Sequence, residues 1–323
     1  AIRFRRGESF DENRDRCASL VSGLSQVAAT NPAAWIREAW TPAEVSDITP
    51  ANRMVAFPYT KRMVSNERVD MASAILLTSV GTARRLGVSE DRWVFPHAAT
   101  QLVDPHYFSE LDRYDESANM ALACRSALDL ARLGAADIDV LDLYSCFPSA
   151  VQIEADILGI GPDDPRPLTV CGGMATFGGP IANYVGHVLV DMVNTLRQRP
   201  GKMGLCVANG GYLNRPAAGV YGAEPSATEY QRRDLSAVAA ALPHKRAVGR
   251  IEGTAVVESI TALSVRGVAP RGLATGLVAG PAGDDRRLLA WTEDAELLDR
   301  ITHEELVGRT MTTDDDGRIG SIR

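Results

Sequence analysis

Two short motifs combine small, polar and glycine residues at positions where a chain could do chemistry. The first is DLYSCFPS (residues 142–149), and the second is GGMATFGGP (residues 172–180). Each precedes a helical run, which begins at Ser149 in one case and at Ile181 in the other. Strand-to-helix junctions of this kind present backbone N–H groups and helix N-termini at one edge of a sheet, which suits a thioester carbonyl or a phosphate. These motifs are the best candidate for a functional site.

The elements that position these motifs alternate between strand and helix. Apolar spacing predicts helices over residues 11–29, 70–86, 118–133, 149–160 and 181–196. Strands are predicted over residues 93–96, 139–144, 203–208 and 219–223, and residues 41–58 are expected to be irregular. This alternation indicates an α/β domain of stacked layers around a mixed sheet.

A second domain is predicted after the composition changes near Pro225. Short strands are expected over residues 247–264, 273–278 and 287–291, followed by one helix over residues 295–306. This pattern favours a small β-barrel of the OB type. We therefore expect a first domain over residues 1–225 and a barrel over residues 226–323, joined by a linker over residues 224–234.

Composition limits the classes of partner. The 323 residues carry a net charge of −7 with a pI near 5.4, so no nucleic acid is expected. No apolar run reaches the ~18 residues of a membrane span. The five cysteines lack metal-type spacing, which indicates free thiols, a cytoplasmic location and no metal. The chain starts at Ala1 without methionine, so we expect a fragment or a complementing upstream half.

The motifs resemble those of the thiolase superfamily, in its C-terminal part. YSCF (residues 144–147) stands where thiolases have HDCF or NEAF, GGP (178–180) where they have GHP, and ANGG (208–211) where they have CIGG. The likeness covers nearly all of residues 1–225 and is strongest to actinobacterial proteins similar to acetyl-CoA acetyltransferases, which carry an extra C-terminal OB-like domain. It implies a thiolase-like fold, with coenzyme A as a substrate.

Several positions depart from the thiolase pattern. The resemblance puts Gly179 in place of the histidine that activates the nucleophile, and Ala208 in place of the acid/base cysteine. Cys206 could take that role if the alignment shifts by two residues, because a shift of two keeps the same face of a strand. The nucleophilic cysteine of thiolases belongs to an N-terminal half that this chain lacks. Ordinary thiolysis is therefore hard to derive from these residues.

Three residues are candidates for catalysis. The Tyr144 phenol could donate a hydrogen bond to a developing oxyanion or exchange a proton, or it could be a strand-end aromatic packing beneath a loop. His187, one to two turns into the helix after Pro180, could act as an acid/base group or be a satisfied core histidine. Cys206 is the third, whereas Cys146 is expected to point into the core.

The candidates for substrate binding lie around the same two strand ends. ANGG predicts a turn with positive φ that also offers oxyanion donors, and Asn183 and Tyr184 replace the small residues that line the pantetheine path in thiolases. The complete predicted set is Gly178, Gly179, Asn183, Tyr184, Asn209, Gly210 and Gly211.

Three functions remain open. The superfamily favours an acyltransferase that acts on CoA thioesters in lipid or sterol metabolism. Tyr144 and the OB-like domain resemble the pattern of thiolase-like aldolases, which implies a retro-aldol lyase that cleaves a 3-hydroxyacyl-CoA. The missing histidine favours a non-catalytic acyl-CoA-binding subunit. The expected partners are an acyl-CoA thioester and either a second copy of the chain, as a homodimer, or a complementing N-terminal half.

Overall fold

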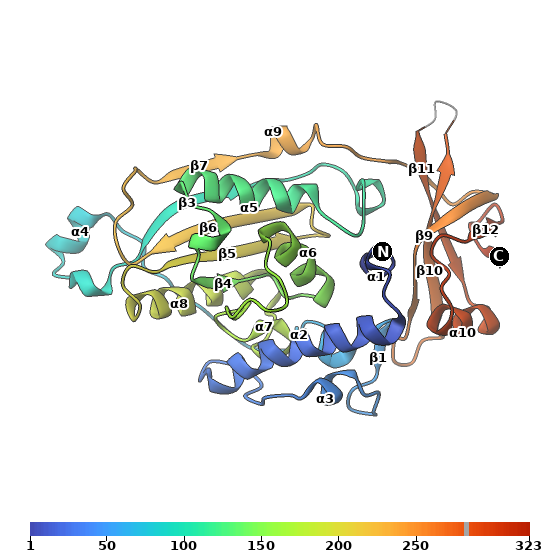
Figure 1. The fold of residues 1–323 in the computed structure, drawn as a ribbon, viewed down its shortest axis with the longest axis horizontal. Coiled ribbons are helices and arrows are strands. Elements are labelled where there is room, and N and C mark those ends of the chain that lie inside the picture. The colour runs from blue at the N-terminus through green and yellow to red at the C-terminus, as the bar shows by residue number, and fades with distance from the viewer. Residues whose placement is uncertain (281–283) are drawn as a thin grey trace.

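The computed structural model describes residues 1–280 and 284–323, and the strands within them form two sheets (Figure 1). The first sheet has the order β4-β5-β6-β3-β7 and combines parallel and antiparallel pairs. Its strands are β3 (Phe95–Gln101), β4 (Val140–Asp142), β5 (Met203–Gly210), β6 (Arg215–Gly222) and β7 (Gln231–Asp234). This mixed sheet with its helices confirms the α/β fold class.

Helices cover both faces of the first sheet. Along β5, Leu205 and Val207 pack into the cluster that contains α5 (Ala118–Ala131) and α6 (Pro148–Leu158). Cys206 points to the other face, into the cluster of α8 (Tyr184–Arg197). The alternation of side chains along a strand therefore gives the centre of the sheet two buried faces, whereas the edge strand β7 is polar and exposed.

Capping residues set the ends of the most regular helices. Ser9 and Glu12 form a capping box at the start of α2 (Phe10–Thr30), and Gly159 ends α6 in the left-handed conformation at φ 67°. The helices predicted over 11–29, 118–133, 149–160 and 181–196 are confirmed. The short helices are α1 (Ile2–Arg6), α3 (Pro42–Ser46), α4 (Val80–Arg85), α7 (Gly173–Thr176) and α9 (Ser236–Ala239). None of the helices in the described parts of the chain is long and apolar enough to cross a membrane.

The helix predicted over residues 70–86 is wrong, because only α4 is helical there. Residues 65–73 instead run in a non-helical course over the second motif. The Gly179 N–H donates to the Asn66 carbonyl at 2.8 Å, and the Ser73 hydroxyl lies 3.1 Å from Asn183 Oδ1. Tertiary contacts with the glycine-rich loop thus override the apolar spacing that predicted a helix.

The C-terminal strands form the second sheet, in the order β13-β12-β9-β10-β11-β8, with β1 joined to β9 and β2 to β1. The predicted strands and helix of this region are confirmed. The strands are β1 (Met54–Ala56), β2 (Tyr59–Thr60), β8 (Arg246–Gly249), β9 (Gly253–Leu263), β10 (Arg271–Ala279), β11 (Asp285–Thr292), β12 (Thr310–Thr313) and β13 (Ile319–Ile322), and the helix is α10 (Ala295–His303).

The ends of the second sheet approach each other. Trp291 of β11 forms a bridge with Arg318, next to β13, which supports the OB-like barrel that remains a prediction. Part of the linker expected over residues 224–234 is a strand, since β7 pairs in parallel with β3 in the first sheet. The chain therefore completes the first sheet with β7 before it forms strands β8 to β13 of the second.

A buried arginine joins the two sheets. Arg287 of β11 has a fully buried side chain and forms a bidentate ion pair with Glu258 of β9, at 2.6 and 2.7 Å. Its remaining donors reach the carbonyls of Ser109, Leu111 and Asp112, which belong to the first domain. One guanidinium thus satisfies a carboxylate and three backbone acceptors across the domain boundary.

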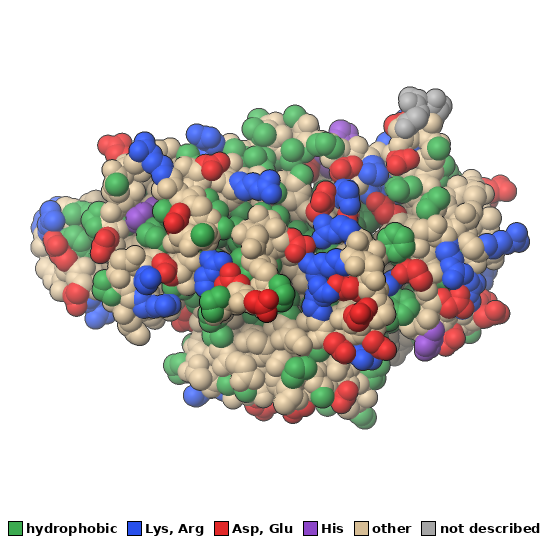
Figure 2. Space-filling view, viewed as in Figure 1, with side chains coloured by type: hydrophobic (Ala, Val, Ile, Leu, Met, Phe, Trp, Pro, Cys, Tyr) green, Lys and Arg blue, Asp and Glu red, His purple; other side chains and the backbone are tan. Residues whose placement is uncertain are grey.

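Helix α1 lies between the first sheet and the C-terminal domain (Figure 1). Arg3 pairs with Glu305 of the C-terminal domain, whereas Arg5 and Arg6 pair with Asp156 of α6 at 2.9 and 2.8 Å. Figure 2 shows basic and acidic side chains intermixed over this seam. These three arginines of one short helix are thus all committed to ion pairs.

Two buried carboxyl groups flank the first motif. Asp142 accepts hydrogen bonds from the Thr169 hydroxyl at 2.7 Å and from the Val170 N–H at 3.0 Å, and Glu154 accepts one from the Tyr144 N–H at 2.7 Å. Burial raises the pKa of Asp142 to about 7 despite these bonds, and it raises the pKa of Glu154 well above its ordinary value. Both acids therefore favour their protonated forms in the folded protein.

We predict that Arg287→Met lowers the free energy of unfolding by about 3–5 kcal/mol, because it leaves Glu258 and three carbonyls buried without their donor. Guanidinium denaturation followed by fluorescence measures the change. The control is Arg271→Met, which removes an exposed ion pair with Glu293 on the neighbouring strand and should cost less than about 1 kcal/mol. Equal losses for the two variants would contradict the assigned role of Arg287.

We also predict that the contribution of Asp142 to stability falls as the pH rises from about 4 to about 7. The folded protein keeps the Asp142 proton up to a pKa of about 7, whereas the unfolded chain releases it near 3.8, so the folded state binds more protons in this window. Asp142 contributes a slope of at most about 1.4 kcal/mol per pH unit.

Asp142→Asn should remove that share of the slope in urea denaturation curves measured across this pH range. Asp164→Asn is the control, because Arg166 lowers the pKa of Asp164 to about 2, below the window. An unchanged slope in Asp142→Asn would show that Asp142 is already ionised.

Candidate functional site

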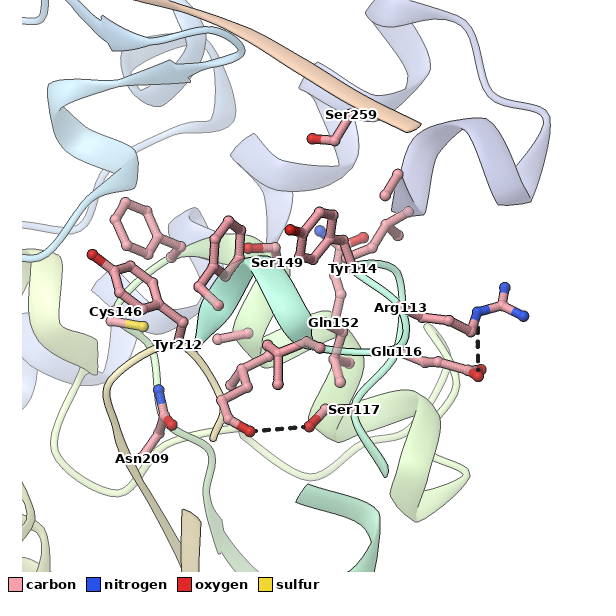
Figure 3. Close-up of a pocket in the computed structure, with 18 of the residues that line it drawn as sticks. Arg113, Tyr114, Glu116, Ser117, Cys146, Ser149, Gln152, Asn209, Tyr212 and Ser259 are labelled. Carbon is pink, nitrogen blue, oxygen red and sulfur yellow. Dashed lines mark hydrogen bonds and ion pairs between the residues drawn. The ribbon is translucent and has the colours of Figure 1, made fainter. Parts of the chain in front are cut away.

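A cavity of about 920 Å³ lies between the first domain and the C-terminal domain. The end of β4, the β5–β6 turn and the loop around Tyr114 supply one side, and β9 with the segment after α10 supplies the other. Figure 3 shows Cys146, Asn209 and Tyr212 on one flank and Ser259 of β9 facing them from the C-terminal domain. The cavity thus brings together residues far apart in the sequence.

Tyr144 lines this cavity at the end of β4. Its ring meets that of Tyr184 edge-to-face, with centroids 5.8 Å apart. Burial raises the pKa of the Tyr144 phenol to about 12, and Cys146 and Glu154 add to the rise. Its backbone N–H donates to the buried Glu154, which fixes the backbone at this position, and its phenol is a neutral donor at the cavity.

Cys146 also lines the cavity, which corrects the expectation that it points into the core (Figure 3). Ser145, between Tyr144 and Cys146, is the residue that points inward, and its hydroxyl accepts a hydrogen bond from the Met174 N–H at 2.9 Å. The alternation of an extended segment explains this arrangement. Burial raises the pKa of Cys146 to about 12, so its sulfur is a neutral thiol at pH 7.

The turn between β5 and β6 provides the remaining predicted residues at the cavity, Asn209, Gly210 and Gly211. Gly211 has φ 66°, as the turn prediction required. Asn209 Oδ1 is buried and has no hydrogen-bond partner among the described residues. Arg215, which follows the turn and lines the cavity, is exposed, and in the described chain its guanidinium has neither an ion pair nor a hydrogen bond.

Tyr184 contributes its ring to the cavity but directs its hydroxyl away from it. The hydroxyl lies 3.2 Å from Cys171 Sγ and 3.5 Å from Asp142 Oδ1, and the residue is 1% exposed. Burial is the main cause that raises the pKa of Tyr184 well above its ordinary value. The structure therefore makes Tyr184 a wall whose polar group belongs to the Asp142 network.

Cys206 and His187 do not line the cavity. Cys206 lies beneath the sheet on the α8 face, 4% exposed, and burial raises its pKa well above the ordinary value. His187 packs edge-to-face against Phe177 at 5.6 Å, and burial lowers its pKa, which favours the neutral imidazole. Cys206 therefore lies in the core and cannot reach a substrate in the cavity, so an alignment shifted by two residues does not give it an acid/base role there.

Gly178, Gly179 and Asn183 also lie away from the cavity, under residues 65–73. A Cβ on Gly179 would lie 2.0 Å from Ser65 Oγ, and one on Gly178 would lie 2.8 Å from Met71 Sδ. These glycines permit the close approach of that segment rather than of a ligand. The Gly172 N–H is likewise committed, because it donates to the Thr169 hydroxyl at 3.0 Å.

Sequence reasoning missed the aromatic lining of the cavity. The rings of Tyr59 and Phe147 stack with their centroids 5.9 Å apart. The centroid of the Phe108 ring lies 4.5 Å from that of Tyr114 and 5.1 Å from that of Tyr212. All five line the cavity. They come from separate segments of the chain, so no spacing in the sequence connects them. Phe147 is the one member of this group that belongs to a motif, because it is the last residue of YSCF.

The loop after β3 supplies a polar cluster at the edge of the cavity. Asp104 lines the cavity and bonds to the His106 ring at 2.6 Å and to Asn119 Nδ2 at 2.6 Å. The His106 ring stacks on His244, which precedes the second sheet, with centroids 4.0 Å apart. This cluster ties the loop to the C-terminal part of the chain.

Comparison with known proteins agrees with this architecture. Residues 234–318 match the family model "Thiolase-like protein type 1 additional C-terminal domain". A solved structure, a monomeric SCP2-thiolase like protein type 1 from Mycobacterium smegmatis, superposes with a TM-score of 0.85 and 30% identity. That match covers 98% of this chain and 70% of the other.

Two curated relatives are thiolases by name. A 3-ketoacyl-CoA thiolase of Erwinia tasmaniensis is 26% identical over 164 residues, which is 45% of this chain and 36% of the relative. Acetyl-CoA acetyltransferase 1 of Arabidopsis thaliana is 30% identical over 92 residues, which is 28% of this chain and 21% of the relative. The matches thus span about a third or less of these relatives. Taken with the solved neighbour, they show that the chain belongs to the thiolase superfamily, in the group that carries an additional C-terminal domain.

Proposed function

We propose that the protein binds an acyl-CoA thioester in the cavity between its domains and transfers the acyl group, in lipid or sterol metabolism. The observation that carries this proposal is the Tyr144 phenol, which lines the cavity beside the Asn209–Gly211 turn. The names of the curated relatives, a thiolase and an acetyltransferase, support acyl transfer as the reaction class. The five free cysteines support a reducing compartment such as the cytoplasm.

Tyr144 suits the stabilisation of negative charge on oxygen. Acyl transfer develops an oxyanion on the thioester carbonyl, and a donor that is fixed in advance stabilises that charge. With its pKa raised to about 12, the phenol keeps its proton at pH 7 and can donate it as a hydrogen bond. Because the phenol is already protonated at pH 7, very little phenolate is present to accept a proton, which weakens the retro-aldol alternative in which Tyr144 is the base.

A second candidate is acyl-CoA binding without turnover. The observation that favours it is the location of Cys206 and His187 outside the cavity, together with the neutral thiol of Cys146. Acyl transfer then requires another acceptor: free CoA, which takes the shortened acyl group when the C2–C3 bond of a 3-ketoacyl-CoA breaks and acetyl-CoA leaves, or a group from another polypeptide. Binding and turnover must therefore be measured separately.

Arg215 would hold the CoA end of the ligand. It is exposed at the wall of the cavity and has no ion pair within the described residues, whereas Arg3 and Arg113 are paired with carboxylates. A guanidinium recognises phosphate through directed, charge-assisted hydrogen bonds. Of the three arginines described at the cavity, Arg215 is therefore the one left without an ion pair and available for the phosphates of coenzyme A.

A complementing polypeptide is the partner that we propose for the run Ile75-Leu76-Leu77. Leu76 and Leu77 are 83% and 81% exposed, and no backbone group of residues 67–78 bonds to another backbone group in the described chain. An extended apolar segment with unpaired backbone is a site for strand pairing. The solved relative is monomeric and extends beyond the matched 70%. Light scattering distinguishes a monomer that needs a complementing chain from a homodimer formed by a second copy.

Tyr144→Phe should reduce turnover about a hundredfold or more, the effect of removing one oxyanion donor, and leave acyl-CoA affinity within about twofold. The assay follows products by mass spectrometry, with 3-ketoacyl-CoA plus free CoA and, separately, with 3-hydroxyacyl-CoA. Tyr212→Phe is the control, since Tyr212 also lines the cavity but is 67% exposed.

A shortened acyl-CoA that depends on free CoA would support acyl transfer. An aldehyde or ketone from the hydroxy substrate would support retro-aldol cleavage instead. Tight binding with no product would favour the binding subunit, and an unchanged rate in Tyr144→Phe would remove Tyr144 from the mechanism.

Arg215→Ala should weaken the binding of free CoA about tenfold at low ionic strength, because a hydrogen bond to a charged group contributes about 1.5–3 kcal/mol. The difference from the unmodified protein should shrink as salt is added. Calorimetric titration measures both effects. Arg246→Ala is the control, since Arg246 is exposed on β8 and does not line the cavity; equal affinities in the two variants would exclude Arg215 as the phosphate site.

A further inference from the structure

The C-terminal domain forms one complete wall of the cavity. Ser259 and Ile260 of β9, Ile301 of α10, and Leu306 and Val307 after α10 all line it. Ser259 points from its strand toward the first domain in Figure 3. A domain that only capped the fold would not need to direct side chains from three separate segments into one cavity.

This wall is mainly apolar, and the charges at its edge are already paired. Glu305 pairs with Arg3, and Glu304 pairs with Arg300 at 3.1 Å. The Ser259 hydroxyl has no hydrogen-bond partner in the part of the chain that the structure describes. A ligand that meets this wall therefore buries apolar surface against Ile260, Leu306 and Val307.

The opposite wall of the cavity is also mainly apolar. Phe147 and Tyr59 stack beside the end of β4, and Phe108, Tyr114 and Tyr212 form a second aromatic group. The Tyr114 hydroxyl and Asn119 Oδ1 are buried without a partner in the described chain. The cavity thus has large apolar faces with a few isolated polar atoms, the composition typical of small-molecule sites.

The volume of the cavity distinguishes between small and large acyl groups as ligands. At about 920 Å³ the cavity is near the upper end of the ~300–1,000 Å³ range of ligand pockets. An acetyl group would leave most of these apolar faces uncovered, whereas burial of further CH₂ groups strengthens binding in proportion to apolar area. The nucleotide and pantetheine parts of CoA are polar, so the acyl group is the part that fits between the two walls.

We propose that the C-terminal domain forms the acyl-binding wall of this cavity and that the preferred ligands are CoA thioesters of bulky apolar acids. This inference rests on the proposed acyl-CoA function and adds to it the substrate class and a role for the additional domain. Ser259 is a position where the wall can be altered without removing a hydrogen bond.

The test compares Ser259→Trp with Val256→Trp by calorimetric titration of free CoA, acetyl-CoA and hexadecanoyl-CoA below its micelle concentration. Val256 is on the same strand, is 46% exposed and does not line the cavity. We expect the unmodified protein to bind hexadecanoyl-CoA at least about tenfold more tightly than acetyl-CoA, the ratio that corresponds to ~1.4 kcal/mol. Ser259→Trp should lose that preference and keep its affinity for free CoA, whereas Val256→Trp should retain both.

Val307→Trp narrows the cavity from another segment and should reproduce the loss if Ser259→Trp fails to fold, as judged by its melting transition. Equal affinity of the unmodified protein for the two thioesters would overturn the inference. A Ser259→Trp protein that loses acetyl-CoA and free CoA as strongly as hexadecanoyl-CoA would also overturn it. If the unmodified protein binds hexadecanoyl-CoA, acetyl-CoA and free CoA equally poorly, the acyl-CoA function itself fails, and the inference that rests on it fails too.

Discussion

The buried contact between Arg287 and Glu258 is the interaction on which the shape of this molecule depends. The Arg287 guanidinium has no access to solvent, and its removal from water costs free energy. The Glu258 carboxylate and the carbonyls of Ser109, Leu111 and Asp112 offset that cost. The Arg287 cation also lies 4.2 Å from the centre of the Tyr114 ring. The loop that carries Phe108 and Tyr114 is therefore held by the second sheet rather than by the first.

The cavity follows from that attachment. Lys245 reinforces it by donating to the carbonyl and carboxylate of Asp112 at 2.6 and 2.8 Å. Arg287 and Lys245 thus both fix the loop that carries Phe108 and Tyr114. The aromatic side chains of this loop face Ser259 and Ile260 across the cavity. Tyr144 is held independently, by Glu154 from behind. Tyr144 and the binding wall are thus positioned through two separate acidic residues, the buried Glu154 in the first domain and Glu258, the partner of Arg287, in the C-terminal domain.

Sequence reasoning predicted what local patterns control. The strand-helix alternation, the C-terminal strands and the turn at Gly211 needed only periodicity and glycine chemistry, and they are confirmed. The helix over residues 70–86 is wrong because packing against the glycine-rich loop decides its conformation. Part of the expected linker is the strand β7, because the edge of β3 offers it a partner.

The candidate site could be predicted only in part, for a similar reason. YSCF and ANGG both contribute residues to one cavity, as the positions of Tyr144 and Asn209 show. GGP does not, because residues 65–73 cover it, and the burial of Cys206 depends on which face of β5 it occupies. The wall from β9 lies beyond the reach of any motif, since residues more than a hundred positions apart meet there.

The pairing of β1 with β9 sets an order of events for the growing chain. Ala56 pairs with Leu263, so about 200 residues are synthesised between the two partners. Domains form from the N-terminal side during synthesis, and distant contacts form late because a long loop must close first. The short strand at Met54–Ala56 can pair early with β2, but it must wait for β9 until the second sheet has been made. Closure of the cavity is a late step in the maturation of this protein.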